Sequence, residues 1–198
     1  MFSMGTSHSK HFKGKLEGTI ELDETFVGGK NKNRHWDKKV KNNQGRALID
    51  KVGVFGMLNR EGKLFVYAMG RIEGKGLKGR GLQALVRNKV EKGSNIATDE
   101  YRGYNGLNKN YYHGRVIHRK GNYVNGECHT NTLEGFWNLL KKTVMGIHFG
   151  VVRKRYLQRY CKEAAYRYVT RRYLKYDRMQ EIMTDCLFGR YVNKGLYL

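Results

Sequence analysis

The sequence contains no proline, only three cysteines and no long uncharged apolar run in its 198 residues. Cys128, Cys161 and Cys186 are odd in number and far apart, so a disulfide framework is not expected. A membrane-spanning helix would need about 18 consecutive apolar residues. The segment before Lys15 also lacks the apolar stretch of a signal peptide. These absences favour a soluble, intracellular protein with no membrane partner.

Acidic residues are scarce as well: 17 Asp and Glu stand against 39 Lys and Arg, a formal net charge of +22. Such an excess indicates a polyanionic partner, and nucleic acid is favoured because no helix combines a wide apolar face with a basic one. Between Arg153 and Arg178, basic residues alternate with tyrosines, which suits phosphate contacts and base stacking. For that helix alone, a solvated basic face over core tyrosines is an equally good interpretation.

Apolar patterns predict a single mixed α/β domain. Strands are expected at 18–27, 51–58, 63–70, 95–98 and 115–118, and helices at 77–90, 130–145, 154–172 and 180–187. A four-residue connection at 59–62 indicates a hairpin, and the later strand, helix, strand order favours parallel pairing. The predicted order has three antiparallel strands, then two parallel strands with flanking helices and a helical C-terminal tail. This is the strand plan of ribonuclease-H-like folds. We expect a flexible segment over 1–16, the domain over 17–190 and a tail over 191–198.

Three acids occupy positions that a polyanion-binding protein has reason to keep free of negative charge. Asp23 lies late in the first strand, Asp99 ends a short apolar run, and Glu134 lies on the helix expected at 130–145. If they converged, each pair would repel by about 4 kcal/mol at 4 Å with an effective dielectric near 20, and Mg²⁺ would remove that cost. Each acid alone is also explained as an ordinary surface or strand-end charge, so spacing and composition leave the question open.

Glu134 shares one face of its helix with Asn131 and Lys141, because the apolar residues form a separate stripe. That stripe consists of Leu133, Phe136, Trp137, Leu140 and Val144. Lys141 is 141 − 134 = 7 residues beyond Glu134, so it lies roughly 10 Å further along the same face. This spacing lets the lysine contact a phosphate next to one held at Glu134.

Three segments resemble the catalytic domain of DDE transposases, and most closely the ISXO-like insertion-sequence group related to the Merlin elements. They run from Glu21 to Lys30, from Thr98 to Tyr104 and from His129 to Trp137. The distance 134 − 99 = 35 residues and the lysine at 134 + 7 = 141 are typical of that family. Residues 156–171 resemble its helical tail, although Arg167-Tyr168-Val169 stands where arginine-tyrosine-asparagine is usual.

The resemblance implies that Asp23, Asp99 and Glu134 are catalytic and hold two Mg²⁺ or Mn²⁺ ions, with Lys141 contacting phosphate. Water would cut the element's end, and the freed 3′ hydroxyl would attack target DNA, with no covalent enzyme intermediate. Transposon ends and target DNA would be the partners of a homodimer or higher multimer located with the cell's DNA. Asn131 and His129 are neighbours of interest, because some members carry asparagine or histidine as the third site residue. DNA contacts are expected from Lys141, Asn131, Arg153, Arg155 and Arg159.

Some alternatives stay open. Glu24 and Glu100 directly follow two of the proposed ligands, and strand alternation alone does not say which of each pair faces the metal; the family pattern selects the aspartates.

No Cys-x-x-Cys zinc motif is present, so a catalytically decayed or domesticated DNA-binding protein without an end-recognition module is the alternative function. Tyrosine-based recombination is disfavoured because 14 tyrosines make chance neighbours of arginine common.

Overall fold

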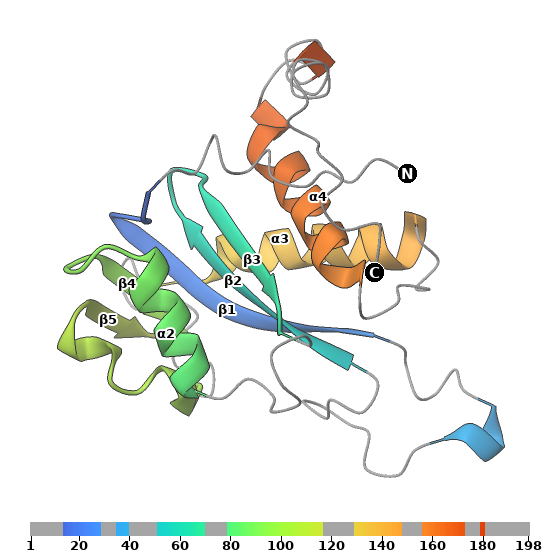
Figure 1. Cartoon of the computed structure of the whole chain (residues 1–198), viewed down its shortest axis with the longest axis horizontal. Helices are drawn as coiled ribbons and strands as arrows, with labels where there is room; N and C mark the ends of the chain where they lie inside the picture. Colours follow the sequence, from blue (N-terminus) through green and yellow to red (C-terminus); the bar gives the residue numbers. More distant parts are fainter. Residues whose placement is uncertain are drawn as a thin grey trace, which may run out of the picture.

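The computed structural model describes residues 14–28, 35–39, 51–69, 79–116, 129–147, 156–172 and 179–180, and all structural statements refer to these. Five strands form one sheet in the order β3-β2-β1-β4-β5. Their bounds are β1 Thr19–Gly28, β2 Lys51–Asn59, β3 Leu64–Ala68, β4 Asn95–Thr98 and β5 Tyr112–Arg115. The central strand β1 pairs antiparallel with β2 and parallel with β4, while β2 pairs antiparallel with β3 and β4 parallel with β5 (Figure 1).

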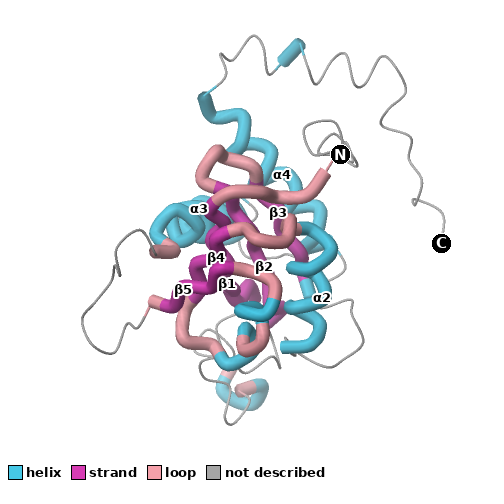
Figure 2. Tube along the Cα trace, turned by 90° about the vertical axis from the view of Figure 1, so that its left-hand side faces the viewer, coloured by secondary structure: helices cyan, strands magenta, loops and turns pink. Residues whose placement is uncertain are grey.

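Helices cover both faces of this sheet. Helix α2 (Gly79–Lys89) and helix α3 (Asn131–Lys142) lie on opposite sides of the strands (Figure 2). Helix α4 (Leu157–Val169) shares its core cluster with α3, whereas α2 belongs to the other cluster. Shorter helical turns are η2 Trp36–Lys38, η4 Arg102–Tyr104, η5 Leu107–Lys109 and η9 Thr170–Arg172, and a π-helical turn η7 Thr143–Ile147 extends α3. Because α3 and α4 pack against β1, β2 and β3, the central strand is held between helical layers.

The period of two along each strand divides the core into two clusters. Along β1, Ile20 and Leu22 join the cluster under α2, whereas Val27 joins the cluster under α3 and α4. The stripe expected on α3 is buried as a whole, since Leu133, Phe136, Trp137, Leu140 and Val144 all lie in the core. The odd-numbered positions of β1 therefore face α3, and Asp23 is one of them.

The mixed α/β sheet with its antiparallel and parallel parts is confirmed, and it is compatible with a ribonuclease-H-like fold. The fifth strand was placed wrongly: it was expected at 115–118, but β5 runs over Tyr112–Arg115. The apolar, β-branched residues from Val116 onward favoured the later position, whereas pairing with β4 begins at an exposed tyrosine. Val116 still follows the ladder, since its N–H donates to the Thr98 carbonyl oxygen.

Two further expectations, the flexible segment over 1–16 and the helix over 180–187, overlap the described residues only at one end. Leu16, assigned to the flexible N-terminal segment, is fully buried and forms a bridge with Val90. The helix expected at 180–187 lies outside the described residues, apart from helical Gln180. Within the described part of the chain, no helix has the length and apolarity needed to cross a bilayer.

Candidate active site

Asp23 and Asp99 come together because β1 and β4 are parallel neighbours. The register runs from Thr19 with Asn95 to Glu21 with Ala97, an offset of 95 − 19 = 76 residues, and continued past the end of β4 this offset brings position 23 + 76 = 99 to the level of Asp23. Paired residues of neighbouring strands point to the same face, so both aspartates belong to the side that carries α3. The strand register therefore joins two acids that lie far apart in the sequence.

A third carboxylate completes the cluster, and it is Glu24. One carboxylate oxygen from each of Asp23, Glu24 and Asp99 lies within 4.8 Å of the other two, and all three residues are half-buried. The buried Tyr104 hydroxyl donates a hydrogen bond of 2.6 Å to Glu24 Oε2. Burial, together with the Glu24 charge, holds the pKa of Tyr104 well above its usual value, so this hydroxyl keeps its proton. Tyr104 thereby fixes the orientation of Glu24.

Glu134 lies close to this cluster without being part of its tight group. It is exposed on the first turn of α3, and its charge is one of those that raise the pKa of Asp23. The expected exposed face of α3 is present, since Asn131 and Lys141 are also exposed. The structure thus brings Asp23, Asp99 and Glu134 to one region, and Glu24 belongs to the same cluster as the two aspartates.

Asp23 is the most strongly perturbed acid of the site. Its pKa is raised from 3.8 to about 6, mainly by burial and in smaller part by the negative charges of Asp99 and Glu134. Hydrogen bonds from the indole N–H of Trp137 and the backbone N–H of Glu24 oppose the shift, at 2.9 and 2.8 Å. Partly buried carboxylates that repel one another are the oxygen donors that Mg²⁺ and Mn²⁺ bind, so the residues present fit a divalent cation.

Trp137 contacts Asp23 next to a glycine, which has no side chain to block the approach of the indole. Gly56 of β2 pairs with Asp23, and a Cβ built on it would lie 2.7 Å from Trp137 Cη2 and 3.0 Å from Leu133 Cδ1. The glycine therefore leaves room for the indole, whose N–H lies within hydrogen-bond distance of the aspartate. Sequence reasoning assigned Trp137 to the core alone and passed over Gly56.

We expect Gly56→Ala to destabilise the fold by about 1–3 kcal/mol, the usual cost of forcing extra volume into a packed core. The methyl group would displace the Trp137 ring from Asp23, so the near-ultraviolet circular dichroism of the buried tryptophan should change together with the urea midpoint. Gly135→Ala is the matched control: nothing lies within 4 Å of its added Cβ, and alanine should stabilise α3 by about 0.5–1 kcal/mol. A destabilisation of equal size in both variants would contradict this account of Gly56.

The Asp99 carboxylate is oriented by the backbone that follows β4. Its Oδ1 accepts a 2.9 Å hydrogen bond from the Tyr101 N–H, and the Thr98 hydroxyl donates to the Asp99 carbonyl oxygen. The same hydroxyl lies 2.8 Å from Nε2 of His113, whose pKa is lowered to about 4 by burial and by the Arg115 charge. A neutral imidazole next to the strand end thus adds no positive charge to compete with a bound cation.

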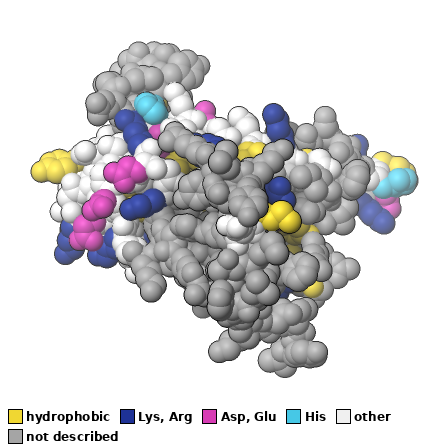
Figure 3. All heavy atoms as spheres, turned by 90° about the horizontal axis from the view of Figure 1, so that it is seen from above, with side chains coloured by type: hydrophobic (Ala, Val, Ile, Leu, Met, Phe, Trp, Pro, Cys, Tyr) yellow, Lys and Arg dark blue, Asp and Glu magenta, His cyan; other side chains and the backbone are white. Residues whose placement is uncertain are grey.

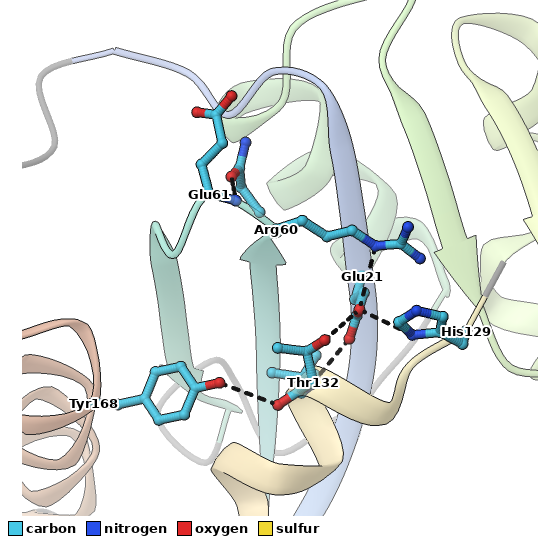
Figure 4. A network of polar contacts seen from close by, with 8 residues as sticks. Glu21, Arg60, Glu61, His129, Thr132 and Tyr168 are labelled. Atoms are coloured by element: carbon cyan, nitrogen blue, oxygen red, sulfur yellow. Dashed lines mark hydrogen bonds and ion pairs between the residues drawn. The ribbon is translucent and has the colours of Figure 1, made fainter. Parts of the chain in front are cut away.

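Glu21 is a buried acid that sequence reasoning missed, although it stands two residues before Asp23 on the same face of β1. It is fully buried, and its carboxylate accepts hydrogen bonds from the Thr132 hydroxyl at 2.8 Å and the Leu133 N–H at 2.9 Å. Arg60 Nε lies 3.7 Å and His129 Nδ1 lies 3.4 Å from the same carboxylate (Figure 4).

The Glu21 carboxylate takes the place of a helix cap. Thr130, at the N-cap of α3, makes no side-chain capping bond, so a first-turn N–H is satisfied by an acid from β1 instead. A negative charge at this end also interacts favourably with the helix dipole. The contact fixes the start of α3, and hence the position of Glu134, against the strand that carries Asp23.

Of the three arginines expected to contact DNA, only Arg159 is among the residues that the structure describes. Arg159 is exposed on α4, with its guanidinium 5.4 Å from the centre of the Tyr156 ring. Arg153 and Arg155 lie outside the described residues. Among the side chains coloured in Figure 3, lysine and arginine occur at both ends of the face, so positive charge is spread rather than confined to one helix.

Comparison with known proteins places this chain among transposases. Residues 15–168 match the family described as the ISXO2-like transposase domain. The chain belongs to this family, and with it to the DDE-type insertion-sequence transposases. It is also 29% identical over 149 residues to an uncharacterized protein in transposable element ISH50 of Halobacterium salinarum. That similarity covers 71% of this chain and 49% of the relative, so the chain spans about half the length of the relative it matches.

Proposed function

We propose that this chain is the ribonuclease-H-like catalytic domain of a DDE transposase, which cuts DNA and transfers the cut strand. The observation that carries the proposal is the register that aligns Asp23 with Asp99, with ligand oxygens of the two within 4.8 Å of each other. Membership of the transposase family supports DNA as the substrate. The charge of +22 supports the same partner class.

In this proposal Asp23, Asp99 and Glu134 hold two divalent cations, Mg²⁺ or Mn²⁺, and Glu24 adds a fourth carboxylate beside them. Bound cations of this kind neutralise charge on the reacting phosphate and stabilise both the attacking and the leaving oxygen. Asp23 and Asp99 would be ligands contributed by the sheet, and Glu134 would be the ligand contributed by α3, where its side chain is exposed.

The protein's own groups hold this arrangement in place before DNA arrives. The Trp137 indole and the Glu24 N–H donate to the two oxygens of Asp23, and the Tyr101 N–H donates to one oxygen of Asp99, so the orientation of both carboxylates is fixed. Such preorganisation reduces the reorganisation needed during phosphoryl transfer. In the proposal, Asn131 and Lys141 contact phosphates along the exposed face of α3, and Arg153, Arg155 and Arg159 do so from the C-terminal region.

The same proposal includes three further features. The chain would act on paired transposon ends, it would form a homodimer or higher multimer, and its catalytic domain would span residues 17–190. These features follow the family rather than any contact within the described residues.

The proposal is tested by incubating the purified chain with supercoiled plasmid and with short duplexes, in Mg²⁺, in Mn²⁺ and in EDTA. We expect nicked or joined products only with the divalent ions, and products that carry 3′ hydroxyl ends. Cleavage that persists in EDTA would contradict the metal-dependent mechanism, and so would a covalent adduct between DNA and a tyrosine.

A further inference from the structure

A hollow lies on the α3 side of the sheet, at the β4–β5 end. It has a volume of about 500 Å³ and is lined by Thr19, Asn95, Ile96, Ala97, Tyr112, His113 and Gly114. Thr19, Asn95 and Tyr112 form one row across β1, β4 and β5, and Glu21, Ala97 and Gly114 form the next row on the same face. The small side chains of the second row, above β4 and β5, make this part of the sheet concave.

The rim of this hollow carries groups suited to a nucleotide. Tyr112 is 73% exposed although it belongs to a strand, and Asn95 exposes an amide that both donates and accepts hydrogen bonds. The Arg60 N–H donates to the Thr19 carbonyl oxygen, which fixes the arginine at the edge of the lining. The Arg60 side chain is 30% exposed, and it extends from there toward Glu21 (Figure 4).

The hollow lies on the same β4 strand that leads to the acids. Asp99 follows two residues after Ala97, just past the end of β4, and one of its carboxylate oxygens lies within 4.8 Å of one from Asp23. Tyr112 pairs with Asn95, four residues before Asp99, so the two sites are separated by about 13 Å along the strand. That distance corresponds to a few nucleotides, since stacked bases rise about 3.4 Å each.

We propose that this hollow binds a single DNA strand on its way to the acidic cluster, with a base stacked on Tyr112 and a phosphate near Arg60. This inference rests on the proposed function for the identity of the ligand as DNA. An aromatic ring supplies stacking to any base, and the guanidinium supplies charge, so the contact is independent of sequence. A volume of about 500 Å³ admits nucleotides of one strand but not a duplex.

The first test measures binding of a fluorescent 20-nucleotide thymidine strand by anisotropy, in EDTA and at about 200 mM salt, where general electrostatic attraction is reduced. We expect Tyr112→Ala to weaken binding about tenfold, the loss of one stacked base. Tyr112→Phe, which keeps the ring, should bind within about twofold of the wild type. Because Tyr112 is 73% exposed, neither change should unfold the protein, and thermal melting of both variants is the check on this expectation. Equal affinity of Tyr112→Ala and wild type would overturn the proposal.

The second test maps the contact by photo-crosslinking the same strand with 5-bromodeoxyuridine in place of thymidine. We expect an adduct on Tyr112 in the tryptic peptide of residues 110–115, and none on its neighbour Tyr111, which is 5% exposed. Adducts found only elsewhere in the chain would refute the strand path. Neither test requires catalysis: a Tyr112 adduct without metal-dependent cleavage would refute the catalytic proposal alone, and cleavage without the adduct would refute this one alone.

Discussion

Replacing Asp99 by asparagine is expected to reduce metal-dependent DNA cleavage at least about 100-fold. Loss of a group that merely supports a metal ligand already costs about 10- to 100-fold, and Asp99 is proposed to be a ligand itself. The asparagine retains an oxygen able to accept the Tyr101 N–H, so the turn after β4 should survive. The negative charge next to Asp23 is what the variant removes. Initial cleavage rates and Mn²⁺ affinity, the latter from electron paramagnetic resonance, should fall together.

Glu100→Gln is the matched control for this variant. Glu100 is the next residue along the chain, is exposed, and does not belong to the cluster of Asp23, Glu24 and Asp99. Its cleavage rate should stay within about twofold of the wild type, because a solvated charge outside the site contributes little. Similar rates for Asp99→Asn and wild type would exclude the proposed ligand role. A wild type that binds DNA in a salt-dependent manner but gives no product with any metal would favour the decayed or domesticated alternative.

The second large effect is expected on stability, from Glu21→Ala. Removal of this buried carboxylate leaves the Leu133 N–H and the Thr132 hydroxyl without this acceptor, and it removes the ion pair between Glu21 and Arg60. Breaking a buried ion pair or a charged hydrogen bond on one side costs about 3 kcal/mol in total. The free energy of unfolding, measured with urea in the absence of metal, should fall by that amount.

Two comparisons separate the Glu21 charge from simple loss of contacts. Glu21→Gln keeps the size and one acceptor oxygen, so it should retain part of the stability that Glu21→Ala loses. Glu163→Ala removes an acid from a surface pair with Arg167, in which the arginine is 57% exposed, and should cost only about 0.3–0.5 kcal/mol. Losses of the same size for Glu21→Ala and Glu163→Ala would show that the Glu21 network does not stabilise α3.

Local patterns were sufficient to predict most of the sheet. The strand at 95–98 and the hairpin around 59–62 have the expected bounds within one or two residues, because apolar alternation and turn residues are local signals. The fifth strand was missed by three residues, since Tyr112–Arg115 is an edge strand whose exposed tyrosine gives no apolar alternation. The position of β5 in the chain is determined by its pairing with β4. The sequence of one segment alone does not show which strand it will pair with.

The candidate site was predictable only in part, for the same reason. Asp23 and Asp99 could be selected from strand ends and from the family resemblance. Glu24 could not be ranked against Asp23, because the hydrogen bond that orients it comes from Tyr104, 80 positions away. Glu21 was indistinguishable from an ordinary strand residue until α3 was placed on top of it. The role of Gly56 likewise depends on the ring of Trp137, which belongs to another element.

The parallel register of β1 and β4 also determines where this domain tolerates insertions during evolution. Residues added in the connections that join β1, β2, β3, α2 and β4 lengthen loops and leave the two aspartates side by side. One residue inserted between Asn95 and Asp99 would instead turn the second aspartate to the opposite side of the sheet, under α2. Divergent relatives should therefore vary freely in the length of their loops while keeping four residues from the first β4 position to its acid.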